Sequence, residues 1–342
     1  MRKSYVLFAL LTVGALMFAA CQTATPVPTE APVVEPTEAP PPPEPTPVPY
    51  VTCGDPGNPC VITFVPSGDT GKITLAGQGI AEWLWKETGL FFKVEVGTSF
   101  AASIEAMGAE KAQIGFLNTF SVLLAEAKYQ IEPALAVVRK LAVNELSPDK
   151  DLAGTMQPYY RGQFITQKDS GITSLADLKG KTFCFVDPNS TSGYIVPNII
   201  LKANGIDAEA GDLTATFAGS HNNVGIAVYK GDCDAGVTYI DIRSDASANL
   251  GETYPDIMEK VVVFYDTDPI PNDGVQFIKN FDPALKEKIV AAMLKMAESE
   301  DGKALLKSLY NINGLIKIEP TFYDAFAKLM KDAGVDPATL VK

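Results

Sequence analysis

From residue 61 onward, short runs of β-branched and aromatic residues alternate with segments whose apolar residues recur at helical spacing. Such alternation is typical of sheets covered by helices, because each strand and each helix buries an apolar face against its neighbours. The sequence therefore predicts an α/β fold with mainly parallel sheets. The predicted strands are 61–65, 92–96, 112–117, 134–139, 161–166, 181–187, 215–218, 235–240 and 261–265, and the predicted helices are 72–87, 101–108, 120–129, 174–178, 194–204, 223–230, 242–260, 283–298, 302–310 and 323–333.

A polar stretch at residues 144–158 interrupts this pattern, which then restarts. The 342 residues are enough for two domains. The helices after residue 283 have no predicted strands of their own to cover, so we expect them to return to the first domain. The prediction is two lobes joined by two crossing segments near residues 158–161 and 266–272, with lobe 1 at 53–158, lobe 2 at 159–266 and the return to lobe 1 at 267–342. Ligands of such folds bind at the carboxyl ends of strands, facing the cleft.

The N-terminus has the pattern of a secretory signal peptide over residues 1–20. Two basic residues precede an apolar stretch that ends at Ala19 and Ala20, directly before Cys21. A Cys after two small residues resembles the lipobox of bacterial lipoproteins, which implies cleavage before Cys21 and acylation of its thiol. A membrane-spanning helix is the alternative, but the apolar run of about 16 residues is shorter than the roughly 20 that span a bilayer.

Residues 21–52 are predicted to be the acylated Cys followed by a Pro-rich tether. Positions 22–49 contain eleven prolines and four Glu but no Lys or Arg, a composition that cannot bury a core and favours polyproline II. At about 3.1 Å per residue, such a tether reaches on the order of 90 Å. We therefore expect the protein to be anchored by lipid to the cell membrane, on its extracytoplasmic face, either in a periplasm or at the cell surface.

Four further cysteines, Cys53, Cys60, Cys184 and Cys233, lie in the part of the chain that is expected to fold. An extracytoplasmic location permits disulfides, and three pairings are possible in principle. Cys53 and Cys60 are close enough in sequence to close a small loop. Cys184 and Cys233 each lie in or beside a predicted strand, so they are neighbours in one sheet or else two buried thiols; the sequence leaves this open.

Composition and motifs argue against several classes of function. A net charge of −13 is unfavourable for binding nucleic acid, and the chain contains a single His, whereas transition-metal sites usually need several imidazoles. No G-x-S-x-G motif occurs, and residues 68–73 have the wrong spacing for a P-loop. Ser220, His221 and Asp241 can be written as a triad, but adjacent Ser and His is an improbable geometry for one. We therefore expect no enzyme activity, no metal and no cofactor.

Three predicted strand-to-helix turns carry hydrogen-bond donors. The stretch 187–194 contains Ser190-Thr191-Ser192, a second turn at 219–222 contains the single His, and a third holds Asn118 and Thr119. The positive ends of helices attract anions, and helix capping needs one hydroxyl rather than three. These turns, without Lys or Arg, predict a site for an oxyanion held by largely neutral donors. The alternative interpretation of each residue is an ordinary cap or a structural imidazole.

Four stretches resemble phosphonate/phosphite/phosphate-binding proteins of bacterial ABC importers, which have the type II periplasmic-binding-protein fold. The strongest is Asp-Pro-Asn-Ser-Thr-Ser-Gly-Tyr at 187–194, followed by Val196-Pro197; the others are 99–108, 218–221 and 269–273. The resemblance extends from residue 61 to residue 310.

This resemblance implies roles for individual residues. Ser190, Thr191 and Ser192 would hold the phosphoryl oxygens together with His221, while Asp241 and Asp273 would face the remaining substituent. Phe100 and Leu117 stand where some phosphonate binders have Tyr, so two hydroxyl contacts are absent. The full set of candidate ligand-binding residues is Ser67, Phe100, Asn118, Thr119, Ser190, Thr191, Ser192, His221, Tyr239, Asp241 and Asp273.

The sequence thus favours a monomeric solute-binding protein that delivers a small phosphorus oxyanion to an ABC permease. A sensor or signalling lipoprotein of the same fold, an extracytoplasmic hydrolase and a binder of another anion such as a sulfonate are the alternatives. Because ionised carboxylates only accept hydrogen bonds, Asp241 and Asp273 would require a proton or ammonium group on the ligand. We therefore expect sulfate to be rejected, and phosphonate or phosphite to be preferred over phosphate beside the apolar Phe100 and Leu117.

Overall fold

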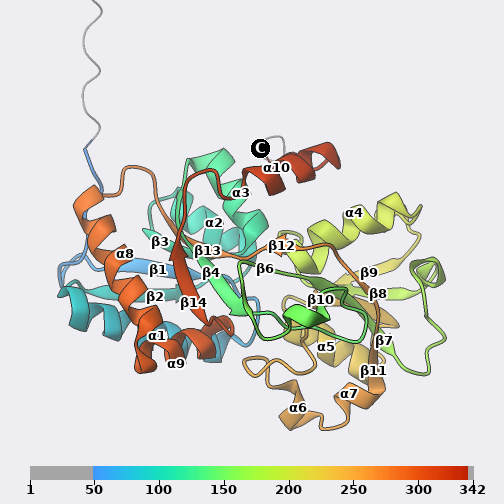
Figure 1. The fold of residues 1–342 in the computed structure, drawn as a ribbon. Helices are drawn as coiled ribbons and strands as arrows, with labels where there is room; N and C mark the ends of the chain where they lie inside the picture. The colour runs from blue at the N-terminus through green and yellow to red at the C-terminus, as the bar shows by residue number, and fades with distance from the viewer. Residues whose placement is uncertain (1–48, 338–342) are drawn as a thin grey trace, which may run out of the picture. The chain divides into compact units, whose positions relative to one another are not determined.

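Residues 49–337 are described by the structure, a computed structural model (Figure 1). The predictions for the signal peptide, for Cys21 and for nearly all of the tether lie outside these residues. Within residues 49–337, no helix has both the length and the apolarity required to cross a bilayer.

The first sheet of the described chain has seven strands: β1 (Cys60–Phe64), β2 (Phe92–Val96), β3 (Ile114–Leu117), β4 (Glu132–Lys140), β5 (Met156–Gln157), β13 (Gly274–Phe277) and β14 (Gly314–Lys317). Their order is β14-β4-β13-β3-β1-β2, with β5 paired to β4. β1 pairs in parallel with β2 and β3, whereas β13 and β14 are antiparallel to their neighbours. The C-terminal part of the chain therefore contributes two strands to the sheet that the N-terminal part begins.

The second sheet has five strands within the described residues: β7 (Gly162–Gln167), β8 (Thr182–Phe185), β9 (Thr214–Phe217), β10 (Ala235–Tyr239) and β11 (Val261–Asp266). Their order is β11-β7-β10-β8-β9. β8 is parallel to β9 and β10, but β7 is antiparallel to β10 and β11. Both sheets are thus mixed, and the expectation of mainly parallel sheets is wrong in this respect. The antiparallel pairs include both neighbours of β7 and both neighbours of β13. These two strands enter their sheets from the crossing segments rather than through a helical crossover, which parallel neighbours would require.

Helices flank both sheets (Figure 1). The longest, α1 (Thr70–Thr88), begins where the Asp69 carboxylate accepts a hydrogen bond from the backbone of Lys72 at 2.8 Å, and it ends at Gly89 with φ +73°. We call the parts of the chain that build each sheet its first-sheet and second-sheet segments. The other helices of the first-sheet segments are α2 (Phe100–Gly108), α3 (Thr119–Tyr129), η1 (Lys150–Leu152), α8 (Pro283–Glu298), α9 (Glu300–Tyr310) and α10 (Asp324–Asp332). Those of the second-sheet segments are η2 (Leu175–Leu178), a π-helical turn η3 (Thr191–Ile195), α4 (Val196–Ala203), α5 (His221–Lys230), α6 (Leu250–Thr253) and α7 (Ile257–Lys260).

The helix predicted over residues 242–260 is wrong, because this segment contains only the single-turn helices α6 and α7. Two aspartates provide the physical reason. Asp241 accepts a hydrogen bond from the backbone N–H of Arg243, and Asp245 accepts one from that of Ser247. Such local bonds offer the backbone an alternative to a helix.

The two predicted crossing segments lie side by side as a small antiparallel ribbon. It consists of β6 (Tyr159–Tyr160) and β12 (Ile270–Pro271). The backbone of Asn272 extends the pairing by donating to the carbonyl of Pro158 at 2.8 Å. We call this pair of strands the crossing ribbon.

Two disulfides are present in the described chain. Cys53 is bonded to Cys60, and Cys184 on β8 is bonded to Cys233, which precedes β10. Because β8 and β10 are neighbours in the second sheet, the second bond joins two adjacent strand segments. The alternative of two buried free thiols at Cys184 and Cys233 is therefore not what the structure contains.

Candidate ligand-binding site

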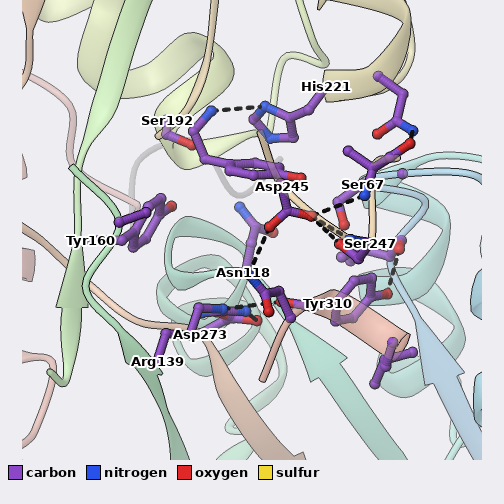
Figure 2. A pocket seen from close by; sticks show the side chains of 18 of the residues that line it. Ser67, Asn118, Arg139, Tyr160, Ser192, His221, Asp245, Ser247, Asp273 and Tyr310 are labelled. Atoms are coloured by element: carbon purple, nitrogen blue, oxygen red, sulfur yellow. Dashed lines mark hydrogen bonds and ion pairs between the residues drawn. The ribbon is translucent and has the colours of Figure 1, made fainter. Parts of the chain in front are cut away.

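A pocket lies between the two sheets, where strands end and helices begin (Figure 2). The first-sheet segments contribute Ser67 after β1, the start of α2, and Asn118 after β3. The second-sheet segments contribute the hydroxyl loop, defined as Ser190-Thr191-Ser192, the start of α5, and the end of β10. The crossing ribbon adds Tyr160. The carboxyl ends of strands from both sheets thus meet at one cavity, as expected for this class of fold.

Thr191 joins the hydroxyl loop to the opposite sheet. Its Oγ1 accepts hydrogen bonds from Nδ2 of Asn118 at 2.8 Å and from the backbone N–H of Phe120, in the first turn of α3, at 2.9 Å. Nδ2 of Asn118 also donates to the carbonyl of Asn189 at 2.9 Å. Since Oγ1 accepts both bonds, neither of them uses the hydroxyl hydrogen of Thr191.

His221 is a neutral donor at the start of α5. Its Nδ1 accepts a hydrogen bond from the backbone N–H of Tyr239 at 3.2 Å, so the ring hydrogen is on Nε2. Nε2 lies 3.4 Å from Oγ of Ser190. Burial lowers the pKa of His221 to about 3, so the imidazole is uncharged near neutral pH. The site therefore presents a directed N–H group rather than a cation at this position.

Tyr160 brings a phenol from the crossing ribbon to the same region. Burial raises its pKa to about 12, although the hydroxyls of Ser192 and Thr191 act in the opposite direction by hydrogen bonding. Tyr160 therefore keeps its proton at neutral pH and is a further uncharged donor beside the hydroxyl loop.

Arg139 and Asp273 form an ion pair in the wall of the pocket. Nη1 of Arg139 lies 2.5 Å from Oδ1 of Asp273, and Nη2 donates to Oδ2 at 3.1 Å. Arg139 also donates to Oδ1 of Asn272 and to the carbonyl of Tyr310, both at 3.1 Å. The pocket lining thus includes a cationic residue that the three donor-bearing turns did not indicate, because the sheet pairing of β4 with β13 brings Arg139 to Asp273.

Asp245 lies in the same pocket, on a loop held from both sides. Its Oδ1 accepts hydrogen bonds from the hydroxyl and the backbone N–H of Ser247 and from the backbone N–H of Ala248. Its Oδ2 accepts one from Nδ2 of Asn311, which follows α9, at 2.8 Å. Nζ of Lys72 reaches the carbonyl of Ser247 at 3.4 Å. Side chains of the first-sheet segments thus hold a loop of the second-sheet segments.

Most of the predicted ligand-binding residues line this pocket, although their contacts with a ligand stay a prediction. They come from seven separate stretches of the sequence. The residues in question are Ser67, Phe100, Asn118, Ser190, Thr191, Ser192, His221, Tyr239 and Asp273.

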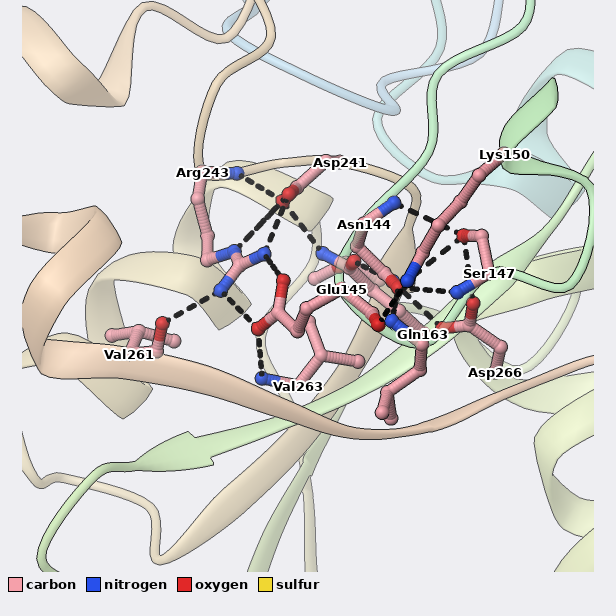
Figure 3. A network of polar contacts seen from close by, with 12 residues as sticks. Asn144, Glu145, Ser147, Lys150, Gln163, Asp241, Arg243, Val261, Val263 and Asp266 are labelled. Carbon is pink, nitrogen blue, oxygen red and sulfur yellow. Dashed lines mark hydrogen bonds and ion pairs between the residues drawn. The ribbon is translucent and has the colours of Figure 1, made fainter. Parts of the chain in front are cut away.

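Asp241 does not line the pocket, and its predicted role needs correction. Figure 3 shows Asp241 within a network of polar contacts. Its carboxylate is bound by Arg243, with Oδ2 and Nη2 2.7 Å apart, and it accepts a hydrogen bond from Nε2 of Gln163 at 3.0 Å. Arg243 also binds Glu145. Burial alone would raise the pKa of Glu145, but the hydrogen bonds from Arg243 and the backbone outweigh it and lower the pKa to about 2. Asp241 therefore belongs to a buried ionic network.

Thr119 is likewise absent from the pocket lining. It is buried at the start of α3, and its Oγ1 donates to the carbonyl of Pro271 in the crossing ribbon at 2.6 Å. Its hydroxyl therefore links two protein segments. Leu117, which was expected to be an apolar neighbour of the ligand, is also buried outside the lining residues.

Sequence reasoning missed Arg139, Tyr160 and Asp245. Arg139 is the last residue of a predicted strand, and the pattern of a strand does not indicate which residues of a neighbouring strand it contacts. Tyr160 fell in a predicted crossing segment, a position next to the cleft, and that was the available signal for it. Asp245 was assigned to a helix that does not form.

A metal centre is not formed by the described residues, since no group of three or more His, Cys, Asp or Glu side chains within residues 49–337 is placed to hold an ion.

The profile of a protein family described as "ABC transporter, phosphonate, periplasmic substrate-binding protein" matches residues 62–323. The chain belongs to this family. The resemblance drawn from the hydroxyl loop is thereby confirmed, as is the prediction that the chain is not an enzyme, because this phosphonate-transporter family consists of substrate-binding proteins.

Known proteins related to this family member include the phosphate-import protein PhnD of Mycolicibacterium smegmatis, which is 27% identical over 60% of this chain and 63% of its own length. The chain spans less than two thirds of the curated relatives it matches. A binding protein of an ABC phosphonate transporter from Pseudomonas aeruginosa superimposes with a TM-score of 0.68, at 21% identity over 81% of this chain and 87% of that one. PhnD1 of Prochlorococcus marinus, solved with methylphosphonate, gives a TM-score of 0.65 at 17% identity over 80% and 98%. These similarities confirm the α/β fold of two-lobe binding proteins.

Proposed function

We propose that this protein is the extracytoplasmic solute-binding component of an ABC importer. It captures a phosphonate, or a related phosphorus oxyanion such as phosphite or phosphate, in the pocket between the two sheets. The observation that carries this proposal is the convergence of the hydroxyl loop and the neutral donor His221 on one cavity.

The arrangement of donors suits a tetrahedral oxyanion. The hydroxyl loop lies at the start of a continuous helical segment formed by η3 and α4, and His221 lies at the start of α5. Backbone N–H groups in the first turn of a helix have no partner within it, and the helix dipole favours a negative charge there. Hydroxyls, Nε2 of His221 and the phenol of Tyr160 add directed donors. Together they supply hydrogen bonds to several oxygens of one phosphoryl group.

Two of the related proteins are described with a phosphorus oxyanion. One is called a phosphate-import protein, and another was solved with methylphosphonate. In this chain, the buried ring of Phe100 gives the pocket an apolar element, which favours a P–H or P–C face over a fourth oxygen. We therefore rank phosphonate and phosphite above phosphate.

The sequence predicts that sulfate is rejected because two carboxylates face the ligand. The structure removes this reason. Asp241 is bound by Arg243 away from the pocket, and Asp273 is paired with Arg139. We therefore no longer expect those two groups to repel a dianion.

The proposal includes a lipid anchor at Cys21 and an ABC permease as the partner of a monomeric protein. The anchor is supported by the apolar N-terminal stretch that ends in Ala-Ala-Cys, and the tether by the Pro-rich composition that follows. The permease is supported by membership of the phosphonate-transporter family.

Calorimetry of the purified protein tests the proposed ligand class. Methylphosphonate, phosphite, phosphate, methylsulfonate and sulfate are titrated in turn, with thermal shift as an independent readout, since a ligand that binds only the native state raises stability. We expect at least one phosphorus oxyanion to bind more tightly than both sulfur oxyanions. Thr214→Ala, an exposed hydroxyl on β9, is the matched control for variants of the hydroxyl loop. Absence of binding to every phosphorus oxyanion would refute the proposal.

A further inference from the structure

Arg139 occupies the two oxygens of Asp273 in a bidentate pair. The pair is largely sequestered, since the two side chains are 19% and 18% exposed. Arg139 is further fixed by Asn272 and by the carbonyl of Tyr310. Bidentate pairs of this kind are geometrically specific and stronger than neutral hydrogen bonds. The pair is therefore a fixed part of the pocket wall.

The pairing changes what Asp273 can recognise. An unpaired carboxylate beside a ligand attracts a cationic group, because it can only accept hydrogen bonds and carries a full charge. A carboxylate that is already neutralised by a guanidinium at 2.5 Å offers no comparable attraction. A ligand ammonium near Asp273 would also meet the positive charge of Arg139.

Two further carboxylates line the pocket, those of Asp69 and Asp245. Asp69 accepts a hydrogen bond from the backbone N–H of Lys72 at the start of α1. Asp245 has no ion-pair partner among its hydrogen bonds. Four donors from Ser247, Ala248 and Asn311 already occupy its two oxygens. Its negative charge also interacts with the guanidinium group of Arg139. An ammonium group would have to displace one of these donors in order to reach it.

We infer that Arg139 is a specificity-determining residue, which pairs with Asp273 and thereby makes this pocket select phosphonates with an uncharged substituent over aminoalkylphosphonates. This inference rests on the proposed function and names the substrate class within it.

Two ligands of matched size test the inference by calorimetry. n-Propylphosphonate and 2-aminoethylphosphonate differ by a methyl group in place of an ammonium group. The wild-type protein is expected to bind n-propylphosphonate at least tenfold more tightly. Arg139→Gln leaves Asp273 unpaired, so it is expected to shift the ratio of the two dissociation constants at least tenfold toward 2-aminoethylphosphonate. In the double variant Arg139→Gln, Asp273→Asn, this shift is expected to disappear.

The double variant also guards against misfolding, because it replaces the ion pair with two neutral amides and leaves no buried charge alone. Wild-type preference for 2-aminoethylphosphonate, or an unchanged ratio in a folded Arg139→Gln protein, would overturn the inference. The single variant Asp245→Asn tests the carboxylate of Asp245. If this substitution alone abolished binding of 2-aminoethylphosphonate, Asp245 would determine the specificity and the inference would also fail. Failure of all phosphonates to bind the wild-type protein would instead remove the proposed function, and this inference with it.

Discussion

In the loop at Ser190-Thr191-Ser192, the hydroxyls of Ser190 and Thr191 have different protein partners, so removing each one is expected to have a different effect. Alanine at any of the three positions should weaken oxyanion binding by roughly 1–3 kcal/mol, because a buried ligand oxygen loses a donor. Thr191→Ala should have the largest effect, since it also removes the acceptor for Asn118 and for the start of α3. Calorimetry measures these changes.

Thr191→Ser is the conservative control for this series, because it keeps the hydroxyl and is expected to retain most of the affinity. Three alanine variants that all bind like the wild-type protein would show that the loop only caps a helix.

The buried imidazole of His221 makes the stability of the protein depend on pH. Its pKa is lowered to about 3 in the folded state, against about 6.5 in an unfolded chain. Below pH 6.5 the unfolded state therefore binds a proton that the native state does not, and stability is lost as the pH falls. Between pH 6.5 and pH 4 this loss is on the order of 3 kcal/mol.

Urea unfolding at a series of pH values measures the contribution of His221, with His221→Gln as the comparison. The variant lacks the titrating ring, so its free energy of unfolding is expected to fall less steeply over this interval. Parallel curves for the two proteins would contradict the assignment.

Sequence reasoning reached the hydroxyl loop and His221 because their signal is local: donors directly after a strand and before a helix. Arg139 could not be found in this way. Its partner Asp273 lies 134 positions away, and the strand β13 that brings them together was not predicted. Asp241 was misplaced for the same reason, since its partner Gln163 is 78 positions away on β7.

At the level of strands and helices, the disulfide between Cys184 and Cys233 links neighbouring segments of the second sheet. Replacing both cysteines by Ala is expected to lower the free energy of unfolding by about 2–4 kcal/mol, because the unfolded chain gains conformational freedom. The Cys53–Cys60 bond spans 7 positions rather than 49, so its removal should have an effect smaller by about 2 kcal/mol. Urea unfolding of the two double variants tests this order, and equal losses would contradict it.

Strands and helices with strong local patterns were predicted closely. β2 and α8 coincide with the predicted ranges, because each has a clear period and definite ends. β13 and β14 were missed, since four residues carry too little pattern to identify a strand without the sheet that receives it. The segment between Asp241 and α7 shows the opposite error, because a long helix was predicted there and does not form. Its apolar residues have helical spacing, but the side chains of Asp241 and Asp245 accept hydrogen bonds from the backbone and form turns instead.

For the molecule as a whole, ligand binding is expected to bring the two lobes together by bending at the crossing ribbon. Contacts across the pocket already connect them, including Thr191 with the start of α3 and the backbone of His221 with the carbonyl of Ser67 at 3.1 Å. Small-angle X-ray scattering with and without ligand measures the change. The radius of gyration should fall on saturation, and an unchanged value would count against closure.

The position of Tyr160 on the crossing ribbon has a consequence for the timing of binding. Atoms near a rotation axis move little when two bodies turn about it, whereas atoms far from the axis travel a long way. If the ribbon is the axis, Tyr160 faces an arriving ligand in the same place whether the lobes are apart or together. The bond from Asn118 to Thr191, in contrast, crosses the pocket between the lobes, so it would break if the lobes moved apart. Capture and retention would then depend on different side chains, so the arrival rate and the residence time of a ligand could evolve independently.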